Sequence, residues 1–293
     1  MVVNNYKLRL GEYSDIPQLI NLMQRQYGIV KSEEYFIWQF FKSAYPTVLV
    51  IAEIKETIVG MFGLQRRILN NSYIVGQAID MLVSKDYRGL GIFSNMIDYA
   101  VDNMSDIDLL FVLPNLSGKN AVEKLNWLTV GRIDDLVLYK EDYSKSNDYF
   151  NSFIIDKTNN QLNSFEYSRS IVNWRFNIHP ENNYSILSNN KGEAYLKIFY
   201  DDKNDIKFGD IVFIEMNNTY FINEIVSFFK NKDVQAISTW ALPNTLRYSL
   251  FLNAGFNAFQ RERFLCYRTI GKPIKYLDDL NYWDLHQSDA EFY

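Results

Sequence analysis

The chain of 293 residues carries the same short sequence anchors in each half, in the same order. The matched pairs are Trp38-Gln39-Phe40 with Trp174-Arg175-Phe176, each running to a proline (Pro46 and Pro180), then Gly76–Met81 with Gly209–Ile214, Leu113-Pro114-Asn115 with Leu242-Pro243-Asn244, and Leu125-Asn126-Trp127 with Leu252-Asn253-Ala254-Gly255-Phe256. The matched anchors lie more than 120 residues apart, a spacing far longer than the repeats of a solenoid protein. The pattern therefore indicates a duplicated domain.

The first half has the pattern of an antiparallel meander followed by a strand–helix–strand unit. We expect strands at residues 6–10, 47–54, 58–68, 73–83 and 109–113, and helices that begin near Ser14, at Ser32 and at Ile92. The strand at 109–113 is fully apolar and follows a crossover helix, so it should pair in parallel with the strand at 73–83. We predict an α/β (α+β type) fold of two tandem mixed-sheet domains.

A glycine-containing loop joins the strand at 73–83 to the helix at Ile92. In Arg88-Gly89-Leu90-Gly91, two glycines and a cation lie where backbone N–H groups and the positive end of a helix dipole converge. An anion is expected there. The spacing is not that of a Rossmann loop, and the Gly-Lys-Ser/Thr of a Walker loop is absent. Taken alone, the glycines would also suit a plain turn.

The second half lacks this loop and has only Met216-Asn217-Asn218-Thr219 between its strand and its helix. We therefore predict an anion-binding domain at residues 1–141, a polar linker at residues 142–163, and a degenerate copy of the domain at residues 164–293.

Composition narrows the class of protein. With 47% hydrophobic and 22% charged residues the chain is globular, and a net charge of -5 argues against a nucleic-acid partner. The longest apolar stretches are of strand length, so no membrane segment is expected. The single Cys266 excludes an intrachain disulfide and is expected to be buried, no metal site is predicted, and the first residues lack a signal layout, which favours the cytoplasm.

The run Leu82-Val83-Ser84-Lys85-Asp86-Tyr87-Arg88-Gly89-Leu90-Gly91-Ile92 closely resembles motif A of the GNAT acyltransferase superfamily, in which V-x-P-x-Y-R-G-x-G-I is a common form. The resemblance extends from the start to about residue 140 in motif and order, and over the second half in order alone. It implies tandem GNAT-like domains, the second one degenerate, and acyl-coenzyme A (acyl-CoA) as the co-substrate. The residues it implies for binding acyl-CoA are Met81, Leu82, Val83, Arg88, Gly89, Leu90, Gly91, Ile92, Phe93, Asn115, Ser117 and Asn120.

Three positions depart from the family pattern. Asp86 stands where Gln or Arg is usual, and Phe93 stands where a small residue is usual. Many members have a tyrosine that protonates the departing thiolate, and here its place is taken by Val122, or by Phe251 in the second copy. The donor site is thus expected, but the acid is missing.

For the catalytic base we name Asp80 first, because an acid in an otherwise apolar strand is unfavourable unless it is used or paired. An exposed strand face or a structural ion pair is the alternative. His286, in a C-terminal segment dense in aromatic and acidic residues, is the second candidate, against the alternative of a surface tail. His179, beside a proline, is expected to be a cap or a packed residue.

With its two GNAT-like lobes, its length and a Trp-x-Phe segment in the second lobe, this chain resembles the sugar-nucleotide N-acyltransferases of surface polysaccharide pathways. This resemblance implies transfer of an acetyl or short acyl group to a nucleotide-linked amino sugar, such as a dTDP-amino-dideoxyhexose, in a cleft to which the second lobe contributes. Candidates for its pyrophosphate are Arg175, Arg247, Arg261 and Arg263. An aminoglycoside or peptide N-acetyltransferase and a non-catalytic CoA-binding protein are the alternatives. The expected partner is thus a small molecule, and the oligomeric state is left open.

Overall fold

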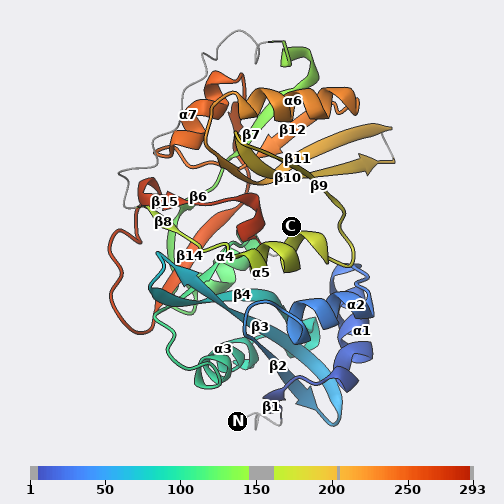
Figure 1. The fold of residues 1–293 in the computed structure, drawn as a ribbon. Coiled ribbons are helices and arrows are strands. Elements are labelled where there is room, and N and C mark those ends of the chain that lie inside the picture. Colours follow the sequence, from blue (N-terminus) through green and yellow to red (C-terminus); the bar gives the residue numbers. More distant parts are fainter. Residues whose placement is uncertain (1–5, 145–161, 203–204, 291–293) are drawn as a thin grey trace.

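The computed structural model describes residues 6–144, 162–202 and 205–290, and its two main β-sheets lie one above the other in Figure 1. The first half contributes β1 (Lys7–Leu10), α1 (Ile16–Tyr27), α2 (Glu33–Phe36), β2 (Thr47–Ile54), β3 (Thr57–Leu69), β4 (Tyr73–Val83), α3 (Ile92–Asp102), β5 (Leu109–Val112), α4 (Leu116–Glu123), β6 (Leu128–Arg132) and β7 (Asp135–Tyr139). The second half contributes β8 (Asn163–Ser164), α5 (Arg169–Val172), β9 (Tyr184–Asn189), β10 (Gly192–Asp201), β11 (Ile206–Met216), α6 (Phe221–Asn231), β12 (Ala236–Thr239), α7 (Leu246–Asn253), β13 (Asn257–Phe259), β14 (Phe264–Thr269) and β15 (Trp283–Asp284).

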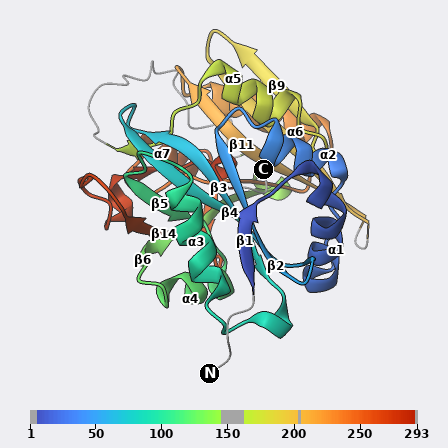
Figure 2. The same cartoon turned by 90° about the horizontal axis from the view of Figure 1, so that it is seen from below.

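The first sheet confirms the predicted mixed pairing. Its strand order is β1-β2-β3-β4-β5-β14-β6, and β4 pairs with β5 in parallel while β1 to β4 form the antiparallel meander. Helices α1 and α2 cover one face of this sheet and α3 covers the other (Figure 2). Each face carries its own apolar core, because successive side chains of a strand point to opposite faces.

The helix that begins at Ser32 is shorter than the sequence suggested. Ser32 caps α2, accepting from the amide of Tyr35, but the helix gives way to a π-helical turn at Ile37–Phe41. Trp38, Gln39 and Phe40 are buried one after another there. The wider π turn lets three successive side chains face the core, which regular α-helical spacing does not.

The second sheet repeats the plan of the first. Its order is β13-β7-β12-β11-β10-β9, with β10 and β11 antiparallel and β11 and β12 parallel. Helix α6 follows β11 as α3 follows β4, and α6 and α7 share one core with the outer face of this sheet. Both crossover units thus have the same topology, which confirms the tandem architecture.

The two sheets exchange strands across the predicted linker. β7, from the first half, lies between β12 and β13, and β14, from the second half, lies between β5 and β6. Each half therefore completes the sheet of the other. The predicted boundaries at 1–141 and 164–293 mark sequence units that share their sheets, and the linker at 142–163 lies mostly outside the described residues.

The C-terminal segment as far as Ala290 runs back between the two sheets (Figure 1). Trp283 and Leu285 are fully buried against the first sheet. Asp289 forms a buried ion pair with Arg67 on β3 at 2.9 Å, and its carbonyl accepts from Gln77 on β4 at 2.6 Å. The segment is therefore part of the core between the halves. In the described parts of the chain, no helix has the length and apolarity to cross a membrane.

Candidate functional site

The strands β4 and β5 diverge after a short stretch of pairing. Their ladder joins Val75–Gln77 to Leu109–Phe111, whereas β3 stays paired with β4 as far as Val83. Among the described residues, the edge of β4 from Ala78 to Val83 therefore has no ladder partner on its β5 side. Main-chain groups on that edge can bind an extended ligand, and this segment contains Met81, Leu82 and Val83, three of the residues predicted to bind acyl-CoA.

The glycine loop follows directly and leads into α3. Gly89 has φ 79°, and Gly91, the N-cap of α3, has φ 74°. A Cβ at Gly89 would meet nothing within 4 Å, so glycine is needed there for the backbone conformation and not for space. The exposed Arg88 side chain folds back so that Nε donates to the Val83 carbonyl at 3.0 Å.

This loop fits the pyrophosphate of acyl-CoA. The first amides of α3, from Ile92 onward, have no partner within the helix, and the helix dipole adds positive potential at the same end. Arg88 lies beside them with a guanidinium suited to phosphate. Leu90 and Ile92 pack into the core below and hold the loop in place.

The two departures in the loop are accommodated. Asp86 is exposed, in a 3-10 turn at Lys85–Tyr87. Phe93 packs edge to face on Phe62, with ring centroids 6.3 Å apart, so its bulk is taken up by the core between α3 and the sheet.

The polar residues predicted after β5 lie at the start of α4. Asn115 is the N-cap, and its side chain accepts from the amide of Gly118 at 2.9 Å. Asn115, Ser117 and Asn120 are all exposed. Because β5 runs parallel to β4, they lie at the end of the sheet where the β4 edge opens.

Asp80 lies at a β-bulge in β4, next to the open edge. The ladder with β3 shifts between Met61 and Gly63, so Asp80 and Met81 face the single residue Phe62. Asp80 has φ 45°, a conformation that aspartate tolerates better than most residues. Bulges next to active sites turn side chains toward the chemistry.

The surroundings of Asp80 shift its acidity toward neutral pH. Burial raises the pKa of the Asp80 carboxyl to about 6, opposed by the charge of Lys31 and by a hydrogen bond from the Tyr35 hydroxyl at 3.4 Å. Lys31 lies over the Tyr35 ring at 3.9 Å and pairs with Glu181 at 2.9 Å. A carboxylate with a pKa near the working pH is suited to general base catalysis.

Sequence reasoning missed Lys31, Tyr35 and Glu181. Lys31 lies between α1 and α2, Tyr35 lies in α2, and Glu181 comes from the second half of the chain. No local spacing connects them with Asp80. The only signal was the helix start at Ser32, whose amide donates to Glu181 at 3.0 Å.

His179 is a packed residue, as expected. Its ring lies against Trp38 with centroids 4.2 Å apart, and Nδ1 accepts from the amides of Glu181 and Asn182. Burial lowers its pKa to about 3, and the charges of Arg175, Lys31 and Lys197 act in the same direction. His179 is therefore neutral, and three cations lie within electrostatic range of it.

His286 has a different setting from Asp80. Its Nδ1 lies 2.7 Å from a nitrogen of Arg247, and its ring packs on Phe213 with centroids 4.6 Å apart. Burial, and then the charge of Arg247, hold its pKa well below the usual range. His286 thus stays neutral near pH 7, and its catalytic role remains a prediction that the geometry does not favour. The alternative of a surface tail is wrong, because the segment around it is buried.

The positions where a tyrosine acid was sought belong to the core. Val122 in α4 and Phe251 in α7 are fully buried among apolar side chains. A different hydroxyl lies beside the open edge: Tyr27, the last residue of α1, is half exposed and donates to the Met81 carbonyl at 3.4 Å.

Residues 16–125, which include β4, Asp80 and the glycine loop, match the model of the Acetyltransferase (GNAT) family. No curated protein matches the chain.

Solved structures with N-acyltransferase descriptions share the fold across most of the chain. A probable N-acyltransferase from Enterococcus faecalis V583 has 10% identity and a TM-score of 0.65, covering 91% of this chain and 73% of its own. A GCN5-related N-acetyltransferase from Kribbella flavida has the same identity and TM-score, with 91% and 72% covered. A GCN5-related glucosamine N-acetyltransferase region of a fungal multi-domain β-N-acetylglucosaminidase has 11% identity and a TM-score of 0.59, with 90% and 38% covered.

At such low identity these structures establish the fold, and the family match covers the segment that holds the loop and Asp80. Residues 16–125 thus match the Acetyltransferase (GNAT) family, and this match supports an acyl-CoA N-acyltransferase activity.

Proposed function

We propose that the protein transfers an acetyl or short acyl group from acyl-CoA to the primary amine of a nucleotide-linked amino sugar, by direct attack on the thioester. The observation that carries the proposal is Asp80, a carboxyl with a pKa of about 6 at a bulge that directly precedes Met81–Val83. This position supports Asp80 as the base that would act where the acceptor amine meets the thioester.

The chemistry follows from these groups. The amine arrives as an ammonium ion, and the Asp80 carboxylate takes one proton so that the nitrogen can attack the thioester carbonyl. Main-chain N–H groups on the β4 edge stabilise the oxyanion. As the C–S bond breaks, the nitrogen loses its second proton to water, which returns a proton to the oxygen that protonates the thiolate. We assign the proton taken up by the thiolate to Tyr27, whose hydroxyl lies 3.4 Å from the Met81 carbonyl.

Cations near Asp80 support a phosphate-bearing acceptor. Burial raises the pKa of Asp80, and the charge of Lys31 opposes that rise. Burial lowers the pKa of Lys197, opposed by the charge of Asp210 and reinforced by the charge of Lys31. Together with Arg175, these lysines also act on His179. Neighbouring cations destabilise each other's charged form. A bound polyanion such as a pyrophosphate would offset this repulsion.

The lysines replace most of the arginines first considered for this role. Arg175 donates to the Ala290 carbonyl, and Arg247 is held by Asp284 and the Leu285 carbonyl, so both are committed to the C-terminal segment. Arg263 lies over Trp240 at 4.6 Å. Arg261 is more than half exposed and forms an ion pair with Asp135 at 3.1 Å.

One structural neighbour supports an amino sugar as the acceptor, since its description names glucosamine N-acetylation. The mixed charges near Asp80 argue less for an aminoglycoside, which would call for a strongly acidic pocket.

Release of free CoA thiol tests the proposal. The chain is mixed with acetyl-CoA and a panel of nucleotide-linked amino sugars, free amino sugars, aminoglycosides, peptides and polyamines. We expect the highest kcat/KM with a nucleotide-linked amino sugar, and a loss in kcat of about 100-fold or more in Asp80→Asn, with unchanged CoA binding. Preference for an aminoglycoside or a peptide would overturn the acceptor class. Tight CoA binding without release by any acceptor would indicate a non-catalytic protein.

A further inference from the structure

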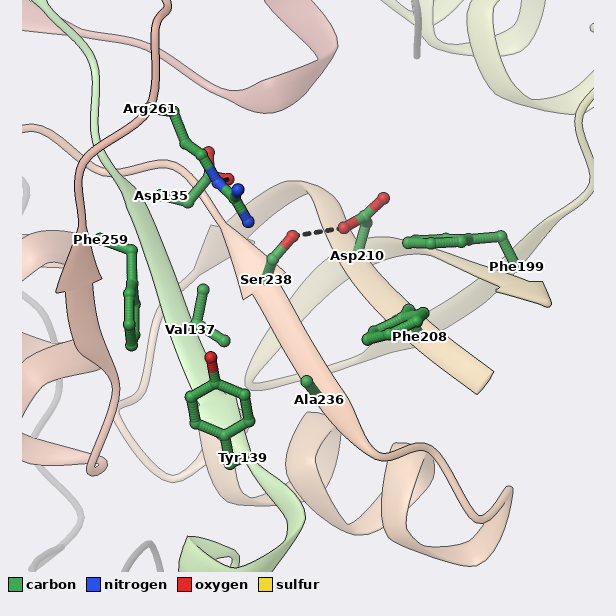
Figure 3. A pocket seen from close by; sticks show the side chains of 11 residues that line it. Asp135, Val137, Tyr139, Phe199, Phe208, Asp210, Ala236, Ser238, Phe259 and Arg261 are labelled. Carbon is green, nitrogen blue, oxygen red and sulfur yellow. Dashed lines mark hydrogen bonds and ion pairs between the residues drawn. The ribbon is translucent and has the colours of Figure 1, made fainter. Parts of the chain in front are cut away.

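A pocket opens on the second sheet, on the face opposite α6 and α7 (Figure 3). Its volume is about 230 Å³. Phe199 and Phe208 form one wall as a stacked pair, with centroids 5.4 Å apart, and Tyr139 and Phe259 form another as an edge-to-face pair at 5.8 Å. These four rings come from β10, β11, β7 and β13, and three of them are 37% to 41% exposed.

The residues that line this pocket differ from those at the equivalent positions of the first sheet. The pair Gln77 and Phe111 on β4 and β5 corresponds by register to Asp210 and Ser238 on β11 and β12. In the first sheet Phe111 is fully buried beneath the C-terminal segment. In the second sheet the same two positions carry a carboxyl and a hydroxyl, and both line the pocket.

The polar end of the pocket combines an acceptor and a donor. Asp210 is 5% exposed and accepts from the Ser238 hydroxyl, which in turn accepts from Gln287 at 3.1 Å. Arg261 donates through Nε to Asp135 at 3.1 Å, and its terminal nitrogens point toward the pocket in Figure 3.

The charges of these groups are balanced. Asp135 pairs with Arg261, and Asp210 lies opposite Lys197 in the β10–β11 ladder, where burial raises the pKa of Asp210 to about 6. An ammonium ion would therefore gain little here. A planar ligand that has both hydrogen-bond donors and acceptors fits better, with aromatic faces to stack on.

We propose that this pocket binds the heteroaromatic base of a nucleotide, stacked on the aromatic walls, with Asp210 accepting an N–H of the base edge and Arg261 donating to a phosphate. The proposal rests on the proposed function and assigns the nucleotide end of the acceptor. Phenylalanine and tyrosine rings can stack on any base. Stacking therefore contributes affinity whichever base is bound. The pocket is smaller than sites for drug-sized ligands, which span roughly 300–1,000 Å³, so it suits one ring system.

The pocket and Asp80 are connected by charge. Lys197 is the ladder partner of Asp210, and Lys31 acts on the pKa values of both Lys197 and Asp80. In this proposal a ligand with its base at Asp210 and one phosphate at Arg261 would extend past Lys197 toward Lys31, with its amine directed toward Asp80. This order matches that of a nucleotide-linked amino sugar.

Calorimetric binding of dTDP, UDP, GDP and ADP to the full chain tests the pocket without any acyl transfer. We expect at least one of them to bind, and Phe208→Leu to weaken that binding about tenfold or more, as loss of a stacking partner does. Asp210→Asn keeps the size of the side chain and should change which base is preferred. Phe41→Leu is the matched control, because Phe41 stacks on Tyr13 in the first half, with centroids 4.1 Å apart, and should leave nucleotide affinity unchanged.

The outcomes separate this proposal from the proposed function. If nucleotides bind equally well to wild type, Phe208→Leu and Asp210→Asn, the pocket assignment is wrong even when acyl transfer to a nucleotide sugar is found. If none of the four diphosphates binds, or if free saccharides or ammonium compounds bind in their place and are lost in Phe208→Leu, the assignment is also overturned. If nucleotide binding depends on Phe208 but no nucleotide sugar is acylated, the pocket stands and the acceptor class fails.

Discussion

Trp38 and Trp174 stack face to face between the two halves, with centroids 4.3 Å apart and planes 11° apart, and each indole Nε1–H donates to the backbone carbonyl of the other, at 2.9 and 3.1 Å. They are the anchors matched in the sequence, 136 residues apart, and each lies on a π-helical turn. The duplication is thus preserved as a self-complementary contact between its two copies.

Replacing one of these indoles should destabilise the protein through the carbonyl left behind. Trp174→Phe keeps a ring but leaves the buried Trp38 carbonyl without its donor, which should lower the free energy of unfolding by about 1–3 kcal/mol, measured by denaturant titration. Trp38→Phe should behave alike, and the double variant should lose less than the sum, because the residues share one contact. Trp283→Phe, which breaks a one-sided bond to the Leu277 carbonyl, should add to Trp174→Phe. Full additivity of Trp38→Phe and Trp174→Phe would contradict the reciprocal contact.

Alanine in the glycine loop should weaken the binding of acyl-CoA. Gly89→Ala forces a side chain into positive φ, at a strain of about 1–2 kcal/mol, and the loop should relax away from the phosphate-binding conformation, raising the KM for acetyl-CoA. Gly28 is the matched control, with φ 69° and equally open space. Gly28→Ala should carry a similar strain and leave this KM unchanged. Equal KM values for the two variants would argue against phosphate binding by the loop.

The rate should fall at acid pH with the titration of Asp80. With a pKa of about 6 in the ligand-free protein, the carboxylate is lost below pH 6, and kcat/KM should drop about tenfold per pH unit there. Because folding raises this pKa above its ordinary 3.8, protonation favours the folded state, and the associated stability is present at low pH and lost as pH rises through 6. Asp80→Asn, which suits positive φ, should abolish the acid limb of the activity it retains. A wild-type rate that is independent of pH between 5 and 7 would exclude Asp80 as the base.

Tyr27 should assist departure of the thiolate. Tyr27→Phe removes the hydroxyl beside Met81 and should lower kcat, by about 100-fold if general acid catalysis is fully used, with little change in the KM for acetyl-CoA. Tyr13→Phe is the matched control, since Tyr13 and Tyr27 are 53% and 52% exposed. If both variants keep the wild-type kcat, another group or water donates the proton.

Cys266 should be inert in the native state. It is fully buried in β14, and burial raises the pKa of its thiol. A disulfide reagent should therefore react with it only after denaturation, and Cys266→Ala should keep wild-type kcat. Rapid modification of the native protein with loss of activity would contradict its position in the core.

The sequence was most informative where structure is local. β2 and β4 begin and end at the predicted residues, and the apolar repeat at Ile92 predicted α3, because strand alternation, turns and helix periodicity are properties of neighbouring residues. Asp80 was also identified locally, as the only acid in an apolar strand. Its bulge was not, since a shift in register depends on the partner strand.

What could not be predicted depends on distant residues. The ion pair between Lys31 and Glu181 joins the two halves, and no sequence pattern near either residue predicts it. The C-terminal segment around Trp283 has the composition of an exposed aromatic and acidic tail, yet Asp289 is buried because Arg67, far away in β3, compensates its charge. These ion pairs and the burial of the C-terminal segment depend on packing and electrostatics between residues that are far apart in the sequence.

The strand exchange sets an order for folding during synthesis. In the described ladders β6 pairs only with β14, and β14 also covers the edge of β5. Until Thr269 has been translated, the first sheet has a gap and β5 keeps an open edge, although the glycine loop and Asp80 have long left the ribosome. The first sheet therefore cannot be completed by the N-terminal half alone, and its open edges need protection from aggregation until β14 has been made.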